Sequence, residues 1–292
     1  MSSVTSNPSV MTPGAKLAVR PVSMRIEPLR GFFNLHLGEL WAYRELLYFF
    51  VWRDVKVRYK QTLVGVLWVV FQPLMTMGVF TIFFGRLAKL PSQGLPYPVF
   101  YFAALVPWAY FSSALTSCTN IVVNNQQVIT KVYFPRLVLP LAAVCSPLID
   151  FSIGLIVMIA LALSFGIRPP ATVLLLPVLI VLAMLTALAV GLWTSALNAL
   201  YRDVASVVPF AVQFWMIASP VAYPSSLVPQ RWRAFYGLNP MAGVIDGFRW
   251  ALTGKGQPPG PPILVSAAMV TVLLIGGLIF FQRMEGEVTD RV

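Results

Sequence analysis

The sequence predicts an all-α polytopic membrane protein, and three observations lead to this fold class. Of its 292 residues, 58% are hydrophobic and 11% are charged, and the mean hydropathy of +0.77 lies outside the range of soluble proteins. The apolar residues form runs, several of which approach the roughly 20 residues that a helix needs to cross a bilayer. Basic residues, which give a net charge of +11, cluster at the ends of these runs. We interpret them as topology signals and headgroup contacts rather than as a nucleic-acid-binding surface.

The N-terminal segment, residues 1–36, is rich in Ser, Pro and Thr and carries scattered basic residues. It contains no apolar run of signal-peptide length. We therefore expect a disordered basic tail.

Residues 37–62 are predicted to form an amphipathic helix at the membrane surface. The half that precedes Trp52 is rich in aromatic and aliphatic residues, but Glu39, Arg44 and Glu45 interrupt it. This half is too polar to span a bilayer and too apolar for a solvated tail, which is the pattern of an interfacial helix.

The second half of this helix is strongly basic. Four cations occur within eight residues of it: Arg53, Lys56, Arg58 and Lys60. At helical spacing all of them except Arg58 fall on one face, and another face carries Trp52, Val55 and Tyr59. Such a helix is expected where anionic headgroups meet water, because each cation there contributes about 1 kcal/mol of attraction. The alternative is an ordinary positive flank of the first membrane span.

Six membrane-spanning helices are expected in residues 63–292. Their approximate ranges are 64–85, 98–118, 137–164, 172–198, 207–223 and 263–281. The fourth and the sixth are clean apolar runs. The fifth has only about 17 residues, fewer than a full crossing needs, and it contains Pro209 and Pro220.

A re-entrant segment is predicted between the fifth and the sixth span. The stretch from Met241 to Leu252 is apolar but too short to span. A half-crossing fits it better, because broken helices are tolerated at membrane depth only where protein or a water-filled path covers them. Gly243 and Gly247 form a GxxxG pattern there, which allows helices to approach closely.

The distribution of basic residues predicts the topology. Six spans place both termini on one side, and fourteen of the 21 Lys and Arg residues fall on that side against seven on the other. The positive-inside rule therefore places both termini in the cytoplasm.

Asp150 is the only acidic residue inside a predicted span. An isolated carboxylate at that depth costs at least about 2.5 kcal/mol, so it must face protein or water. Two interpretations remain open: a hydrogen-bonded aspartate that holds two helices together, and a polar contact in a transport path. No proton relay is predicted, because the single histidine, His36, lies outside the spans.

Aromatic residues are frequent in the first, second and fifth spans. Six of them are candidates for lining a conduit in which sugar rings slide over aromatic faces: Trp68, Phe71, Tyr110, Phe111, Phe214 and Trp215. Aromatic belts at the two membrane interfaces are the alternative explanation.

The sequence carries no enzyme signature that we recognise. A GxxxxGK[ST] phosphate loop, an HExxH motif and a metal-binding Asp-x-Asp pair do not occur in it. The two cysteines, Cys118 and Cys145, share no metal-ligand spacing. We therefore expect no catalytic residue, metal or cofactor in this chain.

Four stretches of the sequence resemble one family. They are RDVKVRYKQTLVGVLWVVFQPL at 53–74, VYFPRLVLPLA at 132–142, YRDV at 201–204 and LNPM at 238–241. Together they are similar to the type 2 permeases of ABC transporters that export polysaccharides, especially O-antigen and other lipid-linked glycans.

The resemblance implies a homodimer of six-span subunits in the bacterial inner membrane, with a channel at or beside the dimer interface. It also implies two copies of a separate ATPase subunit, which would bind ATP and Mg, and a lipid-linked polysaccharide as cargo. In such permeases the loop between the second and third spans supplies a cytoplasmic coupling helix that docks into the ATPase. That loop is here about 125–136, and its end contains Lys131, Tyr133, Phe134, Pro135 and Arg136.

The resemblance also places the basic surface helix at the cytoplasmic entrance, where its four cations could hold the phosphates of the cargo or of bilayer lipids. Other functions stay open. The same kind of permease could export teichoic acid or a small lipophilic compound, and an ATP-independent flippase or channel is a further alternative. A membrane-embedded glycosyltransferase would lack the metal-binding acidic pair that it needs.

Overall fold

The structure is a computed structural model that describes residues 37–291 except 61–62, 257 and 259. The described residues belong to one compact unit, and every regular element among them is a helix. The predicted disordered tail of residues 1–36 lies outside the described residues. The prediction of an all-α protein is therefore confirmed for the part of the chain that the structure covers.

The stretch predicted to be a surface helix is helical in two pieces, α1 (Leu37–Ala42) and α2 (Arg44–Lys60), which meet at Tyr43. Phe50 is the buried residue of α2, and Leu46 and Leu47 pack beside it against the core. The opposite side of α2 keeps large apolar side chains exposed. The position of α2 at a membrane interface stays a prediction.

Five helical stretches are long and apolar enough to cross a membrane. They are Leu67–Leu87, Tyr97–Asn124, Val138–Ser164, Ala171–Leu200 and Pro261–Met284. They coincide with the first, second, third, fourth and sixth predicted spans. By helix, they comprise α3 (Leu63–Phe80) with η1 (Thr81–Leu87), α4 (Tyr97–Asn124), α6 (Val138–Cys145) with α7 (Leu148–Ser164), η2 (Ala171–Leu175) with α8 (Leu176–Leu200), and α12 (Pro261–Arg291).

The predicted fifth span is a shorter helix, α9 (Val204–Ala218). Its 15 residues give a length of roughly 22 Å, less than the roughly 30 Å of a bilayer core. The chain leaves the helix at Ser219 and continues inside the protein, since Ser219 and Val221 are fully buried.

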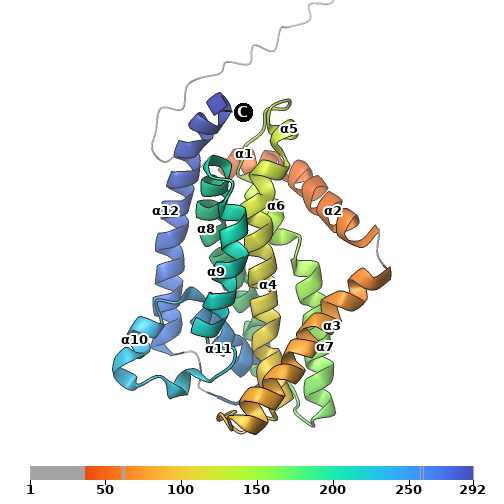
Figure 1. The fold of residues 1–292 in the computed structure, drawn as a ribbon, viewed down its shortest axis with the longest axis vertical. Helices are drawn as coiled ribbons and strands as arrows, with labels where there is room; N and C mark the ends of the chain where they lie inside the picture. Colours follow the sequence, from red (N-terminus) through yellow and green to blue (C-terminus); the bar gives the residue numbers. More distant parts are fainter. Residues whose placement is uncertain (1–36, 61–62, 257, 259, 292) are drawn as a thin grey trace, which may run out of the picture. The chain divides into compact units, whose positions relative to one another are not determined.

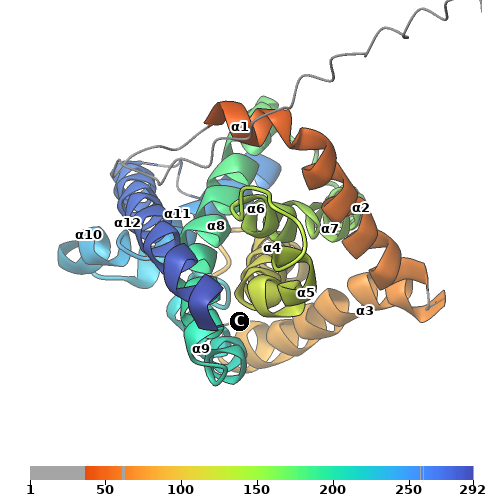
Figure 2. The ribbon, with the colours of Figure 1, turned by 90° about the horizontal axis from the view of Figure 1, so that it is seen from above.

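The centre of the bundle is α4, which is buried along most of its length. It packs against α8, and α8 packs against α12. Viewed from above, α4 and α6 lie between α2, α3 and α7 on one side and α8, α9 and α12 on the other (Figure 2). The short helix α5 (Gln126–Ile129) lies at the same end of the bundle as the C-terminal end of α12 (Figure 1). We call this the α5 end.

The opposite end, the α11 end, is built by the chain between α9 and α12. It contains η3 (Ser225–Leu227), η4 (Gln230–Trp232), α10 (Arg233–Tyr236) and α11 (Pro240–Thr253). The helix α11 is buried almost throughout and packs against α4, α8 and α12.

The GxxxG pattern of α11 lies in these contacts. A Cβ atom at Gly243 would stand 3.1 Å from the Cα atom of Ile263 in α12, and one at Gly247 would stand 2.8 Å from a methyl carbon of Leu179 in α8. The predicted close helix approach at this motif is therefore confirmed.

Candidate functional site

The loop that joins α4 to α6, residues 125–136, is called here the α5 loop. Its helical part is only α5, so the predicted coupling helix of about 125–136 is a single helical turn followed by irregular chain. Lys131 and Tyr133 are exposed, Tyr133 to 81%, whereas Phe134 is only 4% exposed. The loop thus has an exposed tip and an end that is anchored in the protein.

A small apolar groove opens beside this loop. Its lining residues come from the α5 end of the bundle: Val122, Ile129, Arg136, Ala196, Ala199, Phe281 and Met284. Of the predicted coupling residues, Arg136 thus lies at the groove, and Pro135 beside it is half-buried.

The surface helix α2 holds the anchored end of the α5 loop. The rings of Phe50 and Phe134 pack with centroids 5.8 Å apart, and the Nη1 atom of Arg53 donates a 2.8 Å hydrogen bond to the Oδ1 atom of Asn125. Asn125 in turn donates from Nδ2 to the carbonyl of Ile121 in α4. The α2 helix therefore contacts the loop near both of its ends.

Asp150 ties α2 to α7. Arg58 forms an ion pair with the Oδ2 atom of Asp150, and the hydroxyl of Tyr59 donates to its Oδ1 atom. Burial, followed by the interaction with Asp150, raises the pKa of the Tyr59 phenol, which keeps the donor proton in place. Of the two interpretations of Asp150, the structure has the one in which it holds two helices together.

Asp150 lies inside the third span, Val138–Ser164, as predicted. The helix of this span is interrupted between Cys145 and Leu148. Proline at position 147 cannot donate a backbone hydrogen bond to the preceding turn. Asp150 consequently lies in the first turn of α7, where a helix N-terminus favours a carboxylate.

The four cations at the C-terminal end of α2 divide into two pairs. Arg53 and Arg58 face the protein, whereas Lys56 and Lys60 are exposed and have no ion pair or hydrogen bond within the described part of the chain. Arg53 differs from the two lysines in its contacts, because its guanidinium donates to Asn125 and forms an ion pair with Asp54. Lys56 and Lys60 are the cations that remain available to a lipid or a substrate.

Two of the aromatic candidates are interior residues. Tyr110 donates its hydroxyl to the carbonyl of Val144 at 3.0 Å, and both Tyr110 and Phe111 are buried. Trp215 is half-buried, packs against Phe111 and donates from Nε1 to Asn239. The expectation that Tyr110 and Phe111 line a conduit does not fit this burial.

The other aromatic candidates belong to two exposed apolar stripes. One stripe runs along α3 and comprises Trp68, Phe71, Met75 and Val79; the other runs along α9 and comprises Val207, Phe210, Phe214 and Ile217. Residues three or four positions apart share one face of a helix, so each stripe is continuous. These are the surfaces on which a lipid, a second subunit or a cargo could lie.

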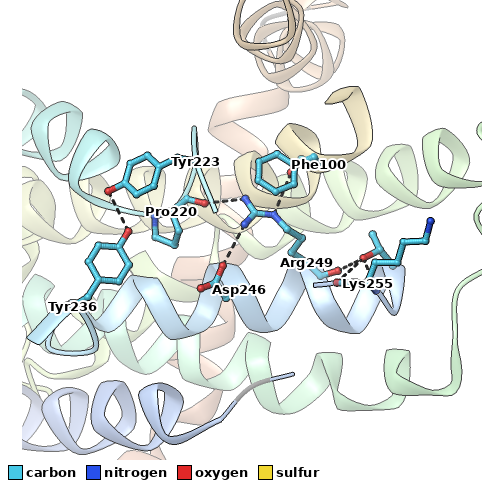
Figure 3. Close-up of polar contacts among 8 residues, drawn as sticks. Phe100, Pro220, Tyr223, Tyr236, Asp246, Arg249 and Lys255 are labelled. Carbon is cyan, nitrogen blue, oxygen red and sulfur yellow. Dashed lines mark hydrogen bonds and ion pairs between the residues drawn. The ribbon is translucent and has the colours of Figure 1, made fainter. Parts of the chain in front are cut away.

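A buried arginine at the α11 end was missed by the sequence analysis, which counted it as a topology signal. Arg249 is 1% exposed, and its guanidinium donates to the carbonyls of Pro220 and Phe100 and to the carboxylate of Asp246 (Figure 3). The signal for it in the sequence was the spacing of Asp246 and Arg249 by three residues inside an apolar stretch.

Among the described residues, no group of three or more His, Cys, Asp or Glu side chains is arranged to hold a metal ion. The functional features that the geometry offers are therefore the α5 loop with α2, the two apolar stripes and the buried polar contacts of Arg249.

Residues 45–253 match the family model described as ABC-2 type transporter. The chain is 29% identical over 257 residues to the O-antigen export system permease protein RfbA of Myxococcus xanthus, an alignment that covers 87% of this chain and 98% of the relative. A protein of the same name from Klebsiella pneumoniae is 28% identical over 234 residues, which is 80% of this chain and 89% of the relative. The polysialic acid transport protein KpsM of Escherichia coli is 19% identical over 234 residues, again 80% of this chain and 91% of that protein.

Proposed function

Because the chain belongs to the ABC-2 type transporter family, we propose that it is the membrane-embedded permease subunit of an exporter that carries a polysaccharide across the membrane. The names of its relatives support this proposal, since they are O-antigen export permeases and a polysialic acid transport protein. In its finer form, the cargo is a lipid-linked polysaccharide of the O-antigen kind, and the membrane is the inner membrane of a bacterium.

The energy would come from ATP bound with Mg by two copies of a separate ATPase subunit. The family match is to the transporter's membrane domain, and the chain carries no phosphate-loop motif of its own. In this arrangement the α5 end faces the cytoplasm, as the positive-inside count predicts for both termini.

The α5 loop is the surface that would contact the ATPase. Its exposed tip, with Lys131 and Tyr133, is free of the bundle. Phe134 is not: it packs on Phe50, so we assign it to transmission rather than to docking. A push on the tip would reach α2 through Phe134 and through the Arg53–Asn125 hydrogen bond.

The exposed lysines of α2 would receive the cargo. Lys56 and Lys60 are exposed on α2, and so is Trp52, a combination suited to phosphates above an apolar layer. A diphosphate-linked glycan lipid and an anionic bilayer lipid both offer this chemistry.

The apolar stripes of α3 and α9 would face a second copy of the chain or the conduit between the two copies. Trp68, Phe71, Phe210 and Phe214 supply aromatic faces there, and aromatic faces suit the apolar side of a sugar ring. The proposed assembly is a homodimer with its conduit along these helices.

The observation that carries this mechanism is the double contact of α2 with the α5 loop. The function itself is tested in a bacterium from which the gene for this chain has been deleted. If the chain is an export permease, the deletion strain should still synthesise the polysaccharide but keep it on the cytoplasmic side of the inner membrane. The wild-type gene should restore the polysaccharide at the cell surface. Normal surface polysaccharide in the deletion strain, together with loss of export of a lipophilic compound, would favour the alternative cargo instead.

A further inference from the structure

The chain that follows α9 crosses the protein interior without a helix. Ser219, Pro220 and Val221 are buried, and the backbone of Ser219 is extended. Irregular backbone in such a place needs partners for its carbonyl groups, because water is not there to supply them. Two side chains, Arg249 and Asn239, bond to this part of the chain.

The first is Arg249 of α11. Its Nη2 atom donates to the carbonyl of Pro220 at 2.8 Å, and its Nε atom donates to the carbonyl of Phe100 in α4 at 3.4 Å. The guanidinium carbon lies 3.8 Å from the centre of the Phe100 ring, and Asp246 accepts from Nη1 at 3.2 Å (Figure 3). A single side chain thus joins α4, α11 and the chain that leaves α9. Only a planar fork with several donors can serve these partners at once.

The second is Asn239, which caps α11 by accepting a hydrogen bond from the backbone N–H of Met241. The same Oδ1 atom accepts from the Nε1 atom of Trp215 at 2.9 Å, and the Nδ2 atom donates to the hydroxyl of Ser219, also at 2.9 Å. The cap of α11 is therefore bonded to the last turn of α9.

These contacts have a consequence for the surface of α9. Trp215 and Ser219 lie on the inner side of the helix, whereas Phe214 and Ile217 lie exposed on the other. Contacts that hold Trp215 and Ser219 in place therefore also determine the direction in which the exposed stripe of α9 points.

We propose that Arg249 and Asn239 are positioning residues that hold the α11 end of α9 and thereby set the geometry of the conduit along its exposed stripe. That these two residues fix the position of α9 is a claim about this chain alone. That the position of α9 affects export rests on the proposed function, in which the exposed stripe of α9 faces the conduit.

The test uses the full chain assembled with its ATPase subunit in lipid nanodiscs. Hydrogen exchange is measured in wild type, in Arg249→Lys and in Asn239→Ser. Lysine keeps the charge but cannot reach all the partners of the guanidinium, and serine keeps the cap of α11 while it loses the reach to Trp215 and Ser219. Lys255→Met is the matched control, because Lys255 donates to the carbonyl of Gly94 at the same end without touching α9.

The proposal predicts that the amides of residues 216–223 exchange about tenfold faster in both variants, since each loses a hydrogen bond in a buried setting. The buried middle of α4 and the control should keep wild-type exchange. Unchanged protection of residues 216–223 in both variants, or a rise of similar size throughout the chain, would overturn the proposal. If Arg249→Lys does not insert, Asn239→Ser alone decides between these results.

The link to export is measured on the same complexes in proteoliposomes, as polysaccharide transported per ATP hydrolysed. A loosened α9 should lower this ratio by about tenfold or more while ATP hydrolysis continues. Local loosening with an unchanged ratio would overturn the role in the conduit. A wild-type complex that transports no polysaccharide would instead contradict the proposed function, and the exchange result would stand apart from it.

Discussion

The Nη1 atom of Arg53 donates a hydrogen bond to the Oδ1 atom of Asn125 at 2.8 Å, which joins the basic surface helix to the first residue of the α5 loop. Asn125 also donates to α4, and Phe50 and Phe134 make a second contact between the same two segments. Two contacts therefore join the helix that carries the exposed cations to the loop that carries the exposed Tyr133. This relationship is the basis of the transmission proposed above.

A double-mutant cycle tests that hydrogen bond. Arg53→Leu and Asn125→Ala, alone and together, should show a coupling free energy of about 1 kcal/mol in thermal unfolding of the solubilised protein. Lys56→Leu removes a cation one turn away that has no partner within the described residues. Lys56→Leu should show no coupling to Asn125→Ala. A coupling as large as that of Arg53→Leu would mean that the measured coupling does not come from the Arg53–Asn125 hydrogen bond.

Phe134 and Tyr133 should give opposite phenotypes although they are neighbours. Phe134→Ala removes a buried ring and should destabilise the protein by about 3 kcal/mol. Tyr133→Ala alters an exposed side chain and should leave the unfolding temperature unchanged but weaken retention of the ATPase subunit in a pull-down. Full retention of the ATPase by Tyr133→Ala would show that the tip of the loop is not the docking surface.

Charge reversal tests the exposed lysines. The double variant Lys56→Glu/Lys60→Glu should insert normally, because neither residue has a partner to lose in the described structure. Its binding to vesicles that contain anionic lipid should fall about tenfold or more at low salt, and the deficit should shrink at high salt. Arg168→Glu, an exposed cation elsewhere, is the control. An equal loss of vesicle binding in the double variant and in Arg168→Glu would mean that Lys56 and Lys60 act only as topology signals.

The contacts of Asp150 should contribute measurable stability. Asp150→Asn keeps an acceptor for Tyr59 but removes the ion pair with Arg58, so we expect a loss of about 1–3 kcal/mol in the free energy of unfolding. Arg58→Leu should cost a similar amount, and the double variant should cost less than the sum of the two. Additive losses would mean that the ion pair is not what each variant removes.

The close helix approach at Gly243 predicts sensitivity to a single methyl group. Gly243→Ala would place a Cβ atom 3.1 Å from the backbone of Ile263, so overpacking should cost about 1–3 kcal/mol. Gly78→Ala in α3 meets nothing within 4 Å and should be neutral or slightly stabilising. Thermal unfolding of the two variants side by side decides this, and equal behaviour would contradict the packing of α11 on α12.

Five of the six spans could be predicted from the sequence because the length and continuity of an apolar run depend on local composition alone. The fifth could not, since the run from 207 to 223 contains both a helix and the buried chain that follows it. Pro220 disfavours a helical conformation at Ser219 and so ends the helix. The side chains that bond to the buried chain, Asn239 and Arg249, in contrast lie 20 or more residues away.

Part of the candidate site could likewise be predicted from the local sequence, and part could not. The basic character of α2 and the exposed position of Tyr133 follow from the local sequence. The inward turn of Arg53 does not, because its partner Asn125 is 72 residues distant. The burial of Arg249 does not follow from the local sequence either, because one of its acceptors, the carbonyl of Phe100, lies 149 residues away.

The most direct test of the central claim is polysaccharide transport in proteoliposomes that contain this chain and its ATPase subunit. The account predicts that wild type transports a lipid-linked polysaccharide only when ATP is hydrolysed, and that Arg53→Leu hydrolyses ATP but transports far less per ATP. Transport that continues without ATP, or an unchanged transport-to-hydrolysis ratio in Arg53→Leu, would contradict it.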